Sequence, residues 1–132
     1  MCDFDGFRPP EMTKKRHVVV LSARSRVSFP STYVVVPVSK TPPGPVEACH
    51  CEFKARSYVF IDQAVSVWAK ADMVTCVASG RLDRVKIAGR FSAARISSSD
   101  LARIRQSVLW TLGMDGWHSP SECSKETEVI NR

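Results

Sequence analysis

Runs of β-branched apolar residues recur along most of the chain and predict short strands separated by turns. The predicted strands cover residues 17–22, 32–39, 48–53, 64–75 and 85–97. Gly89 interrupts the last segment and indicates a bulge or a turn. Pro37 interrupts the second, and because proline cannot donate to a strand ladder, it belongs at an edge or a bulge. Residues 40–47 are rich in proline and glycine, which is typical of a surface loop.

One amphipathic helix is predicted after the strands, over residues 97–113. Serines precede it as N-cap candidates, Asp100 suits the dipole of its first turn, and Gly113 ends it. Its apolar stripe at helical spacing consists of Leu101, Ile104, Val108, Leu109 and Leu112. Trp68, on a predicted strand, and Trp110, beside the stripe, are expected in the core. The pattern predicts a mainly-β fold, a small barrel or half-open sheet with one helix packed on it, and not a doubly wound α/β fold.

Length and composition indicate an ordinary globular domain. The 132 residues suffice for a hydrophobic core, and 44% of them are hydrophobic and 24% charged. No apolar run approaches the roughly 18 residues of a membrane helix. The N-terminus lacks the basic-then-apolar order of a secretory signal. We expect a cytoplasmic protein without a membrane segment, with one domain over residues 1–113 and a flexible tail over residues 114–132.

The five cysteines do not indicate disulfides or a metal. Their odd number and their spacing suit no disulfide framework. The segment “CHCEF” at residues 49–53 offers zinc-type ligands, but no second pair such as CxxC stands elsewhere. We therefore expect reduced thiols, as in cytosolic proteins, and neither a metal nor a cofactor.

Positive charge is concentrated on the body of the chain. The net charge is +6, and the tail from Gly113 holds two basic and four acidic residues, which leaves +8 on residues 1–112. A basic globular body points to a polyanionic partner, most simply a nucleic acid.

Polar groups stand at the entrance of the first predicted strand and at the exit of the second. Lys14, Lys15 and Arg16 precede the first strand, and Ser39 and Lys40 close the second. Taken singly, the arginine is typical of a solvated cation and the serine of a turn. In an antiparallel pair, however, these two ends meet, and a guanidinium, a hydroxyl and an ammonium group together suit a phosphodiester.

The same stretches resemble the MazF/PemK family of bacterial toxin–antitoxin endoribonucleases. The resemblance rests on “RHVVVLSARSR” followed by “STYVVVPVSK”, on “GFRPPEM”, “VWAKADM” and “SGRLDRV”, and on the C-terminal helix, and covers nearly all of residues 2–113. It implies an SH3-like barrel of about five to seven strands with a C-terminal helix. It also implies a homodimeric toxin that cuts single-stranded RNA without a metal and is neutralised by a cognate acidic antitoxin.

The resemblance also assigns site residues. The family's strand-mouth arginine falls on Arg16, its strand-end Thr/Ser on Ser39 and a loop glutamate on Glu11. The basic-x-Asp triplet that takes part in cleavage in the PemK branch reads Lys70-Ala71-Asp72, with lysine where arginine is usual. The expected catalytic residues are Arg16, Ser39, Asp72 and Glu11, and the expected RNA-binding residues are Lys14, Lys15, His17, Lys40 and Lys70.

Metal-free RNA cleavage requires a base near the ribose 2′-OH and stabilisation of the phosphorane by cations and donors. Asp72 and Glu11 both remain open as the base, and Arg16 with Ser39 can stabilise charge or donate a proton. Three aromatic residues beside the basic cluster either stack on bases or anchor loops: Phe7, Phe29 and Tyr33.

Two other functions remain open. One is a toxin of the same fold that poisons a protein such as DNA gyrase, although such a toxin would not need a phosphate cradle. The other is a catalytically inactive RNA-binding or regulatory module, because His17 replaces the family's proline and Lys70 its arginine.

Overall fold

Strands make up most of the regular structure in the part of the chain that is described. The computed structural model describes residues 1–22, 31–54, 58, 66–92 and 94–116. In chain order the elements are β1 (Val18–Val20), β2 (Thr32–Ser39), β3 (His50–Lys54), β4 (Ser66–Lys70), the 3-10 turn η2 (Ala71–Met73), β5 (Thr75–Ala78), the 3-10 turn η3 (Ser79–Arg81), β6 (Val85–Ile87), β7 (Arg90–Ser92) and α1 (Ser98–Thr111). The predicted mainly-β class with one C-terminal helix is confirmed.

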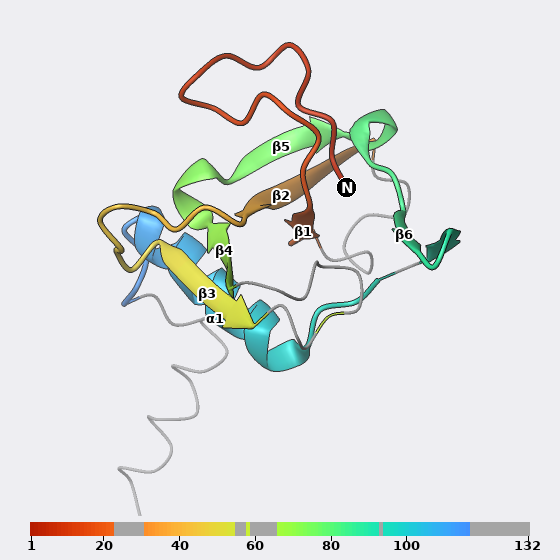
Figure 1. Ribbon diagram of the computed structural model, residues 1–132. Coiled ribbons are helices and arrows are strands. Elements are labelled where there is room, and N and C mark those ends of the chain that lie inside the picture. Colours follow the sequence, from red (N-terminus) through yellow and green to blue (C-terminus); the bar gives the residue numbers. More distant parts are fainter. Residues whose placement is uncertain (23–30, 55–57, 59–65, 93, 117–132) are drawn as a thin grey trace, which may run out of the picture.

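β2 is the central strand, and its bounds match the predicted ones. Its buried residues, 35 to 39, are apolar except for the last, because the cluster under α1 covers one face of β2 and the N-terminal cluster covers the other. β1 pairs antiparallel with one edge, while β5 and then β4 pair antiparallel with the other, and β3 lies beyond β4 (Figure 1). Side chains alternate between the two faces of a strand, so this pairing fixes which residues of β1, β4 and β5 lie beside each residue of β2.

Pro37 lies where the second edge of β2 changes partner. Val38 N–H donates to the His17 carbonyl oxygen over 2.9 Å, so the even-numbered residues of β2 bond to β1 and the nitrogen of Pro37 faces the other edge. At that point β4 has ended at Lys70 and β5 has not begun until Thr75, with η2 between them. The missing N–H therefore costs no ladder bond. The prediction of one strand over residues 64–75 was wrong, because η2 separates two strands there.

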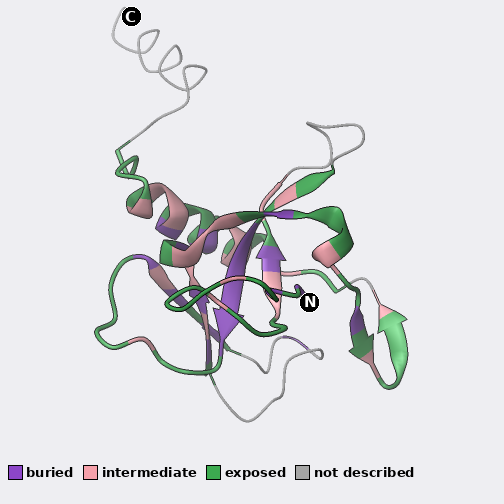
Figure 2. Ribbon diagram, turned by 90° about the horizontal axis from the view of Figure 1, so that it is seen from above, coloured by how far each residue is buried: buried purple, intermediate pink, exposed green. Residues whose placement is uncertain are grey.

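β6 and β7 form a hairpin instead of the single strand predicted over residues 85–97. Ala88 and Gly89 have φ angles of 48° and 78°, as in a two-residue type I′ turn, which confirms a turn at this glycine. The hairpin pairs with no other strand of the described residues, and it projects from the body as a largely exposed ribbon (Figure 2). The described strands therefore do not close into the expected barrel.

Helix α1 covers one side of the sheet and contributes to the larger hydrophobic cluster. Ile104 is fully buried there among residues of β2, β3 and β4, with Leu101 and Val108 packed against the same cluster. The predicted stripe is wrong at its C-terminal end, because 58% of Leu112 is exposed. Trp110, expected in the core, is 44% exposed.

The N-terminal residues form the second cluster, over β2 and β5. Cys2 makes backbone bridges to both Arg16 and Leu82, and Cys2 and Phe4 are almost fully buried. Burial raises the pKa of the Cys2 thiol, which therefore stays protonated. The following loop passes over β5 on the side away from α1 (Figure 1). In the described part of the chain, no helix is long and apolar enough to cross a membrane.

Candidate functional site

The two polar strand ends meet at one end of the β1–β2 pair, as predicted. The register of β1 with β2 continues beyond β1, because Val38 N–H donates to the carbonyl oxygen of His17. The next residues along these two segments are Arg16 and Ser39, which this register places opposite each other. Antiparallel pairing therefore brings the guanidinium-bearing and hydroxyl-bearing residues to the same end of the sheet.

Arg16 has a fixed backbone and an exposed side chain. Its N–H donates to the Cys2 carbonyl oxygen over 2.9 Å, and its own carbonyl accepts from Cys2 N–H over 2.7 Å. The residue is thus anchored by main-chain bonds that do not involve the guanidinium. Sequence analysis did not foresee this role for Cys2, because an isolated bridge leaves no periodic pattern.

Ser39 is nearly buried and begins the turn that follows β2. Its Oγ accepts a hydrogen bond from Thr41 N–H over 3.1 Å, an arrangement common for serine at turns. This bond uses an acceptor lone pair and leaves the O–H proton able to donate. The serine therefore acts in the turn while retaining the donor that a phosphate oxygen requires.

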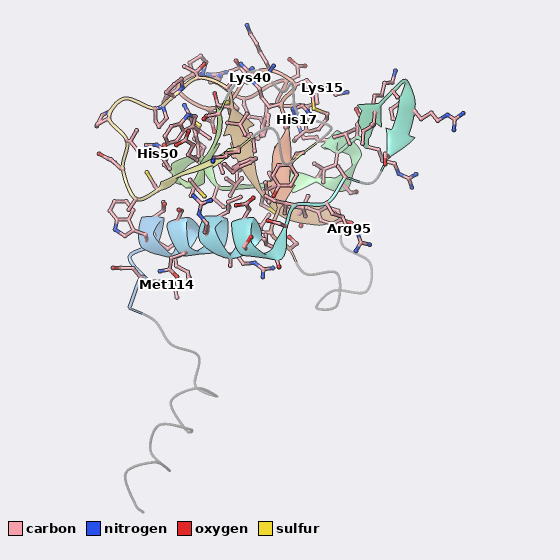
Figure 3. All side chains as sticks on the ribbon, turned by 60° about the horizontal axis from the view of Figure 1, so that its bottom comes forward. Lys15, His17, Lys40, His50, Arg95 and Met114 are labelled. Atoms are coloured by element: carbon pink, nitrogen blue, oxygen red, sulfur yellow. The ribbon has the colours of Figure 1, made fainter. Side chains whose placement is uncertain are left out.

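The other predicted cations surround this end of the sheet. Lys15, His17 and Lys40 lie on the side of the molecule away from α1 (Figure 3). Lys15 forms an exposed ion pair with Asp83, and the bond between them raises the pKa of Lys15 and lowers the pKa of Asp83. Lys14 and Lys40 are also exposed. Lys15 is therefore partly neutralised by the carboxylate of Asp83.

A cleft of about 380 Å³ brings the two candidate bases together. It is lined by the N-terminal loop, by η2 with the start of β5, and by Pro37 of β2. Glu11 enters it from the loop and Asp72 from η2. The break between β4 and β5 thus exposes an acidic group beside the central strand.

Glu11 is engaged within its own loop. Its Oε2 accepts from Arg8 N–H over 2.9 Å, and its N–H donates to the Arg8 carbonyl oxygen over 2.9 Å. These reciprocal bonds close the turn and give the Glu11 carboxylate a structural partner. Asp72 is the better candidate for a base, because no backbone bond of this kind is found at its carboxylate in the described residues.

Asp72 faces a histidine that sequence analysis did not select. Its Oδ1 lies 3.6 Å from His50 Nε2, and the two side chains are 42% and 9% exposed respectively. Lys70, the basic member of the triplet, pairs with His50 in the β3–β4 register. Cys49 is also near. The pKa of its thiol is raised, mainly by burial and also by the negative charges of Asp72 and Glu47.

The aromatic residues of the site have packing partners. Phe7 lines the cleft, stacks edge-on against Phe4 with ring centroids 5.4 Å apart, and lies 5.4 Å from Arg81 Cζ. Tyr33 is partly buried against the N-terminal cluster. Phe29 lies outside the described residues. Both described residues therefore pack against the N-terminal cluster, and Phe7 in addition lines the cleft.

Comparisons with known proteins agree with this architecture. The family model described as PemK-like, MazF-like toxin of type II toxin–antitoxin system matches residues 1–111. The solved structure of the Mycobacterium tuberculosis toxin MazF-mt6 is similar with a TM-score of 0.61 and 15% identity, over 81% of this chain and 94% of that one. At this identity the likeness shows the fold alone.

A curated relative is similar over part of its length. The uncharacterized protein YifN of Escherichia coli strain K12 is 36% identical over 88 residues, which are 63% of this chain. The match spans 56% of YifN, little more than half of that protein.

Proposed function

Because the chain belongs to the family of PemK-like, MazF-like toxins of type II toxin–antitoxin systems, we propose that it is a metal-independent, sequence-selective endoribonuclease. Its substrate is single-stranded RNA, and cutting mRNA would inhibit growth. The observation that carries this proposal is the strand-end pair Arg16 and Ser39 on the same sheet as the Asp72 cleft. Cations for a phosphate and a carboxylate for a hydroxyl proton are the groups that RNA cleavage requires.

The chemistry is an internal displacement at phosphorus. Asp72 removes the proton of the ribose 2′-OH, and the 2′-oxygen forms a bond to the phosphorus while the bond to the 5′-oxygen breaks. Arg16 and the Ser39 hydroxyl stabilise the charge on the phosphorane oxygens, and Arg16 also supplies the proton that the leaving 5′-oxygen gains. The products are a 2′,3′-cyclic phosphate and a 5′-hydroxyl end.

The remaining cations bind the RNA backbone. Lys14 and Lys40 provide exposed positive charge beside the strand ends, His17 follows Arg16, and Lys70 lies two residues before Asp72. Lys15 contributes when RNA phosphates compete with Asp83 for its ammonium group. The expected protein partners are a second copy of this chain and an acidic antitoxin, whose charge would compete with RNA for the same cations.

The test is incubation of the pure protein with long single-stranded RNA in EDTA. Cleavage with cyclic-phosphate and 5′-hydroxyl ends supports the proposal. RNA binding without cleavage contradicts the enzymatic role and favours a regulatory module. Absence of both binding and cleavage favours a toxin that acts on a protein target.

A further inference from the structure

His50 is held in a fixed orientation behind Asp72. It begins β3, and its backbone N–H donates to the Glu47 carbonyl oxygen over 2.9 Å. Its ring Nδ1 accepts from Glu47 N–H over 3.0 Å. The residue therefore closes a small turn through both its backbone and its ring, and its side chain has little freedom to rotate.

The element that carries Asp72 is tied to the same turn. Ala71 N–H donates to the Cys49 carbonyl oxygen over 2.9 Å, which links η2 to the residue before His50. The ring and the carboxylate thus sit on two segments joined by a backbone bond. Their separation of 3.6 Å is slightly longer than a hydrogen bond, and bonds of this kind commonly tighten when substrate binds.

The bonding of the ring determines its tautomer. Since Nδ1 accepts a backbone N–H, its lone pair is occupied, and the neutral ring must carry its proton on Nε2. Nε2 is the nitrogen that faces Asp72. The ring consequently presents a donor to the carboxylate, in the order Glu47 N–H, imidazole, Asp72.

The same bonding argues against a metal at this place. The ligand atoms of Cys49, His50 and Asp72 lie within 4.8 Å of one another, which makes them a geometrical candidate for a cation site. A metal-bound histidine, however, normally donates its second ring N–H to an acceptor. Here that second nitrogen meets a donor, the Glu47 N–H, so the donor set does not suit a metal.

We propose that His50 is a positioning residue that orients the Asp72 carboxylate toward the ribose 2′-OH. This inference rests on the proposed function. With only 9% of its side chain exposed, His50 does not reach the RNA itself. A single Nε2–H donor to Oδ1 leaves Oδ2 directed at the substrate, and it removes the free rotation that an exposed aspartate would otherwise have.

Two matched substitutions test the positioning role by kinetics. His50→Leu removes the donor at similar size, and His50→Gln keeps an amide N–H that reaches toward Asp72. We expect the leucine variant to lower kcat about tenfold to a hundredfold with KM nearly unchanged, since misplacing a catalytic group carries a penalty of this order. The glutamine variant should recover most of kcat. Equal loss in both variants, or a change in KM alone, contradicts the proposal.

A double substitution tests whether His50 acts through Asp72. In an Asp72→Asn background, His50→Leu should cause no further loss of cleavage, because the group that it positions is already absent. Additive losses would show that His50 acts independently and would overturn the inference. Melting temperatures of all variants show whether folding contributes.

A spectroscopic measurement tests the geometry without activity. Long-range ¹H–¹⁵N correlations of the His50 ring should show a protonated Nε2 and an unprotonated Nδ1, and one equivalent of Zn²⁺ should leave them unchanged. The opposite tautomer, or a stoichiometric shift with Zn²⁺, contradicts the positioning of Asp72 by His50. Absence of wild-type cleavage contradicts the proposed function instead, so the two failures are distinguishable.

Discussion

Arg16 combines a backbone pinned on both sides with an exposed guanidinium, so its chemistry can be tested separately from folding. Both of its main-chain bonds go to Cys2. The sequence placed this arginine just before a strand, and the structure shows that its two backbone bonds to Cys2 hold this position in place. At the residue scale, substitution of such an exposed side chain should therefore change activity without disturbing the hydrophobic core.

Arg16→Ala should reduce RNA cleavage by about a hundredfold or more, because loss of one charge-stabilising donor commonly has that effect. The melting temperature should stay within the small range typical of surface substitutions. The matched control is Arg105→Ala, which removes an exposed guanidinium from α1, away from the proposed site. Cleavage of Arg16→Ala at the wild-type rate would leave the cluster as solvated strand-end charge.

Ser39→Ala should lower cleavage less than Arg16→Ala, since a neutral hydroxyl donates a weaker bond than a guanidinium. It should also lower stability, because Thr41 N–H loses its acceptor. Rate and melting temperature measured on the same preparation separate the two effects. A larger kinetic loss than that of Arg16→Ala contradicts this order.

Asp72→Asn should lower the cleavage rate about 10²- to 10⁴-fold, the range for a general base. Glu11→Gln should retain most of the rate, since the amide oxygen can still accept from Arg8 N–H. Single-turnover cleavage of one RNA oligonucleotide compares the two variants. The reverse order of losses would move the base to Glu11.

At the scale of elements, local signals predicted β2 and α1 well. They failed where the pairing with another strand sets the bounds of an element. The capping serine and the stop glycine mark α1 in the sequence, and both are found in place. The break between β4 and β5 is different, because apolar residues alternate with Lys70 and Asp72 through it, as they would in a continuous strand. Apolar periodicity reports burial and not hydrogen-bond partners, so it cannot show where a strand changes neighbours.

The N-cap of α1 provides a test at this scale. Ser97 Oγ accepts from Asp100 N–H over 3.1 Å. Ser97→Ala should lower the free energy of unfolding by about 0.5–2 kcal/mol, the usual range for a lost N-cap. Ser98→Ala, one residue further along the helix, is the control and should change little. Urea denaturation measures both, and equal effects would contradict the capping role.

At the scale of the whole molecule, charge and exposed apolar surface predict association. Residues 1–112 carry a net charge of +8, Lys15 and Lys40 lie on the side away from α1 (Figure 3), and several large apolar side chains are exposed. The tail expected over residues 114–132 lies mostly outside the described residues. The proposed affinity for RNA and the predicted self-association both depend on this surface as a whole.

Binding to single-stranded RNA should weaken steeply as salt increases, because phosphate contacts release counterions. Fluorescence anisotropy with a labelled RNA at several salt concentrations gives the slope. Lys40→Ala should make the slope of log affinity against log salt concentration shallower by about 1, the contribution of one phosphate contact. An affinity that is flat between low and physiological salt contradicts the charge argument.

The protein should be a homodimer at micromolar concentration. Val20 on β1 and Val34 on β2 are 41% and 39% exposed, and a second copy of the chain would bury these apolar side chains. Light scattering measures the mass directly. A monomer at this concentration contradicts the prediction.

The local sequence determined the strands with β-branched runs, the helix with its caps, the basic body and the polar strand ends that hold Arg16 and Ser39. These properties depend on neighbours along the chain, so periodicity and residue type reveal them, whereas Glu11 and Asp72 were assigned by the family resemblance. The tertiary structure decided that Asp72 shares a cleft with Glu11, that Cys2 pins Arg16, and that His50 faces Asp72. It also decided that the described strands stay open instead of forming a closed barrel. Each of these depends on which distant segments pair, and pairing is set by packing and backbone bonds between segments that carry no shared signal in the sequence.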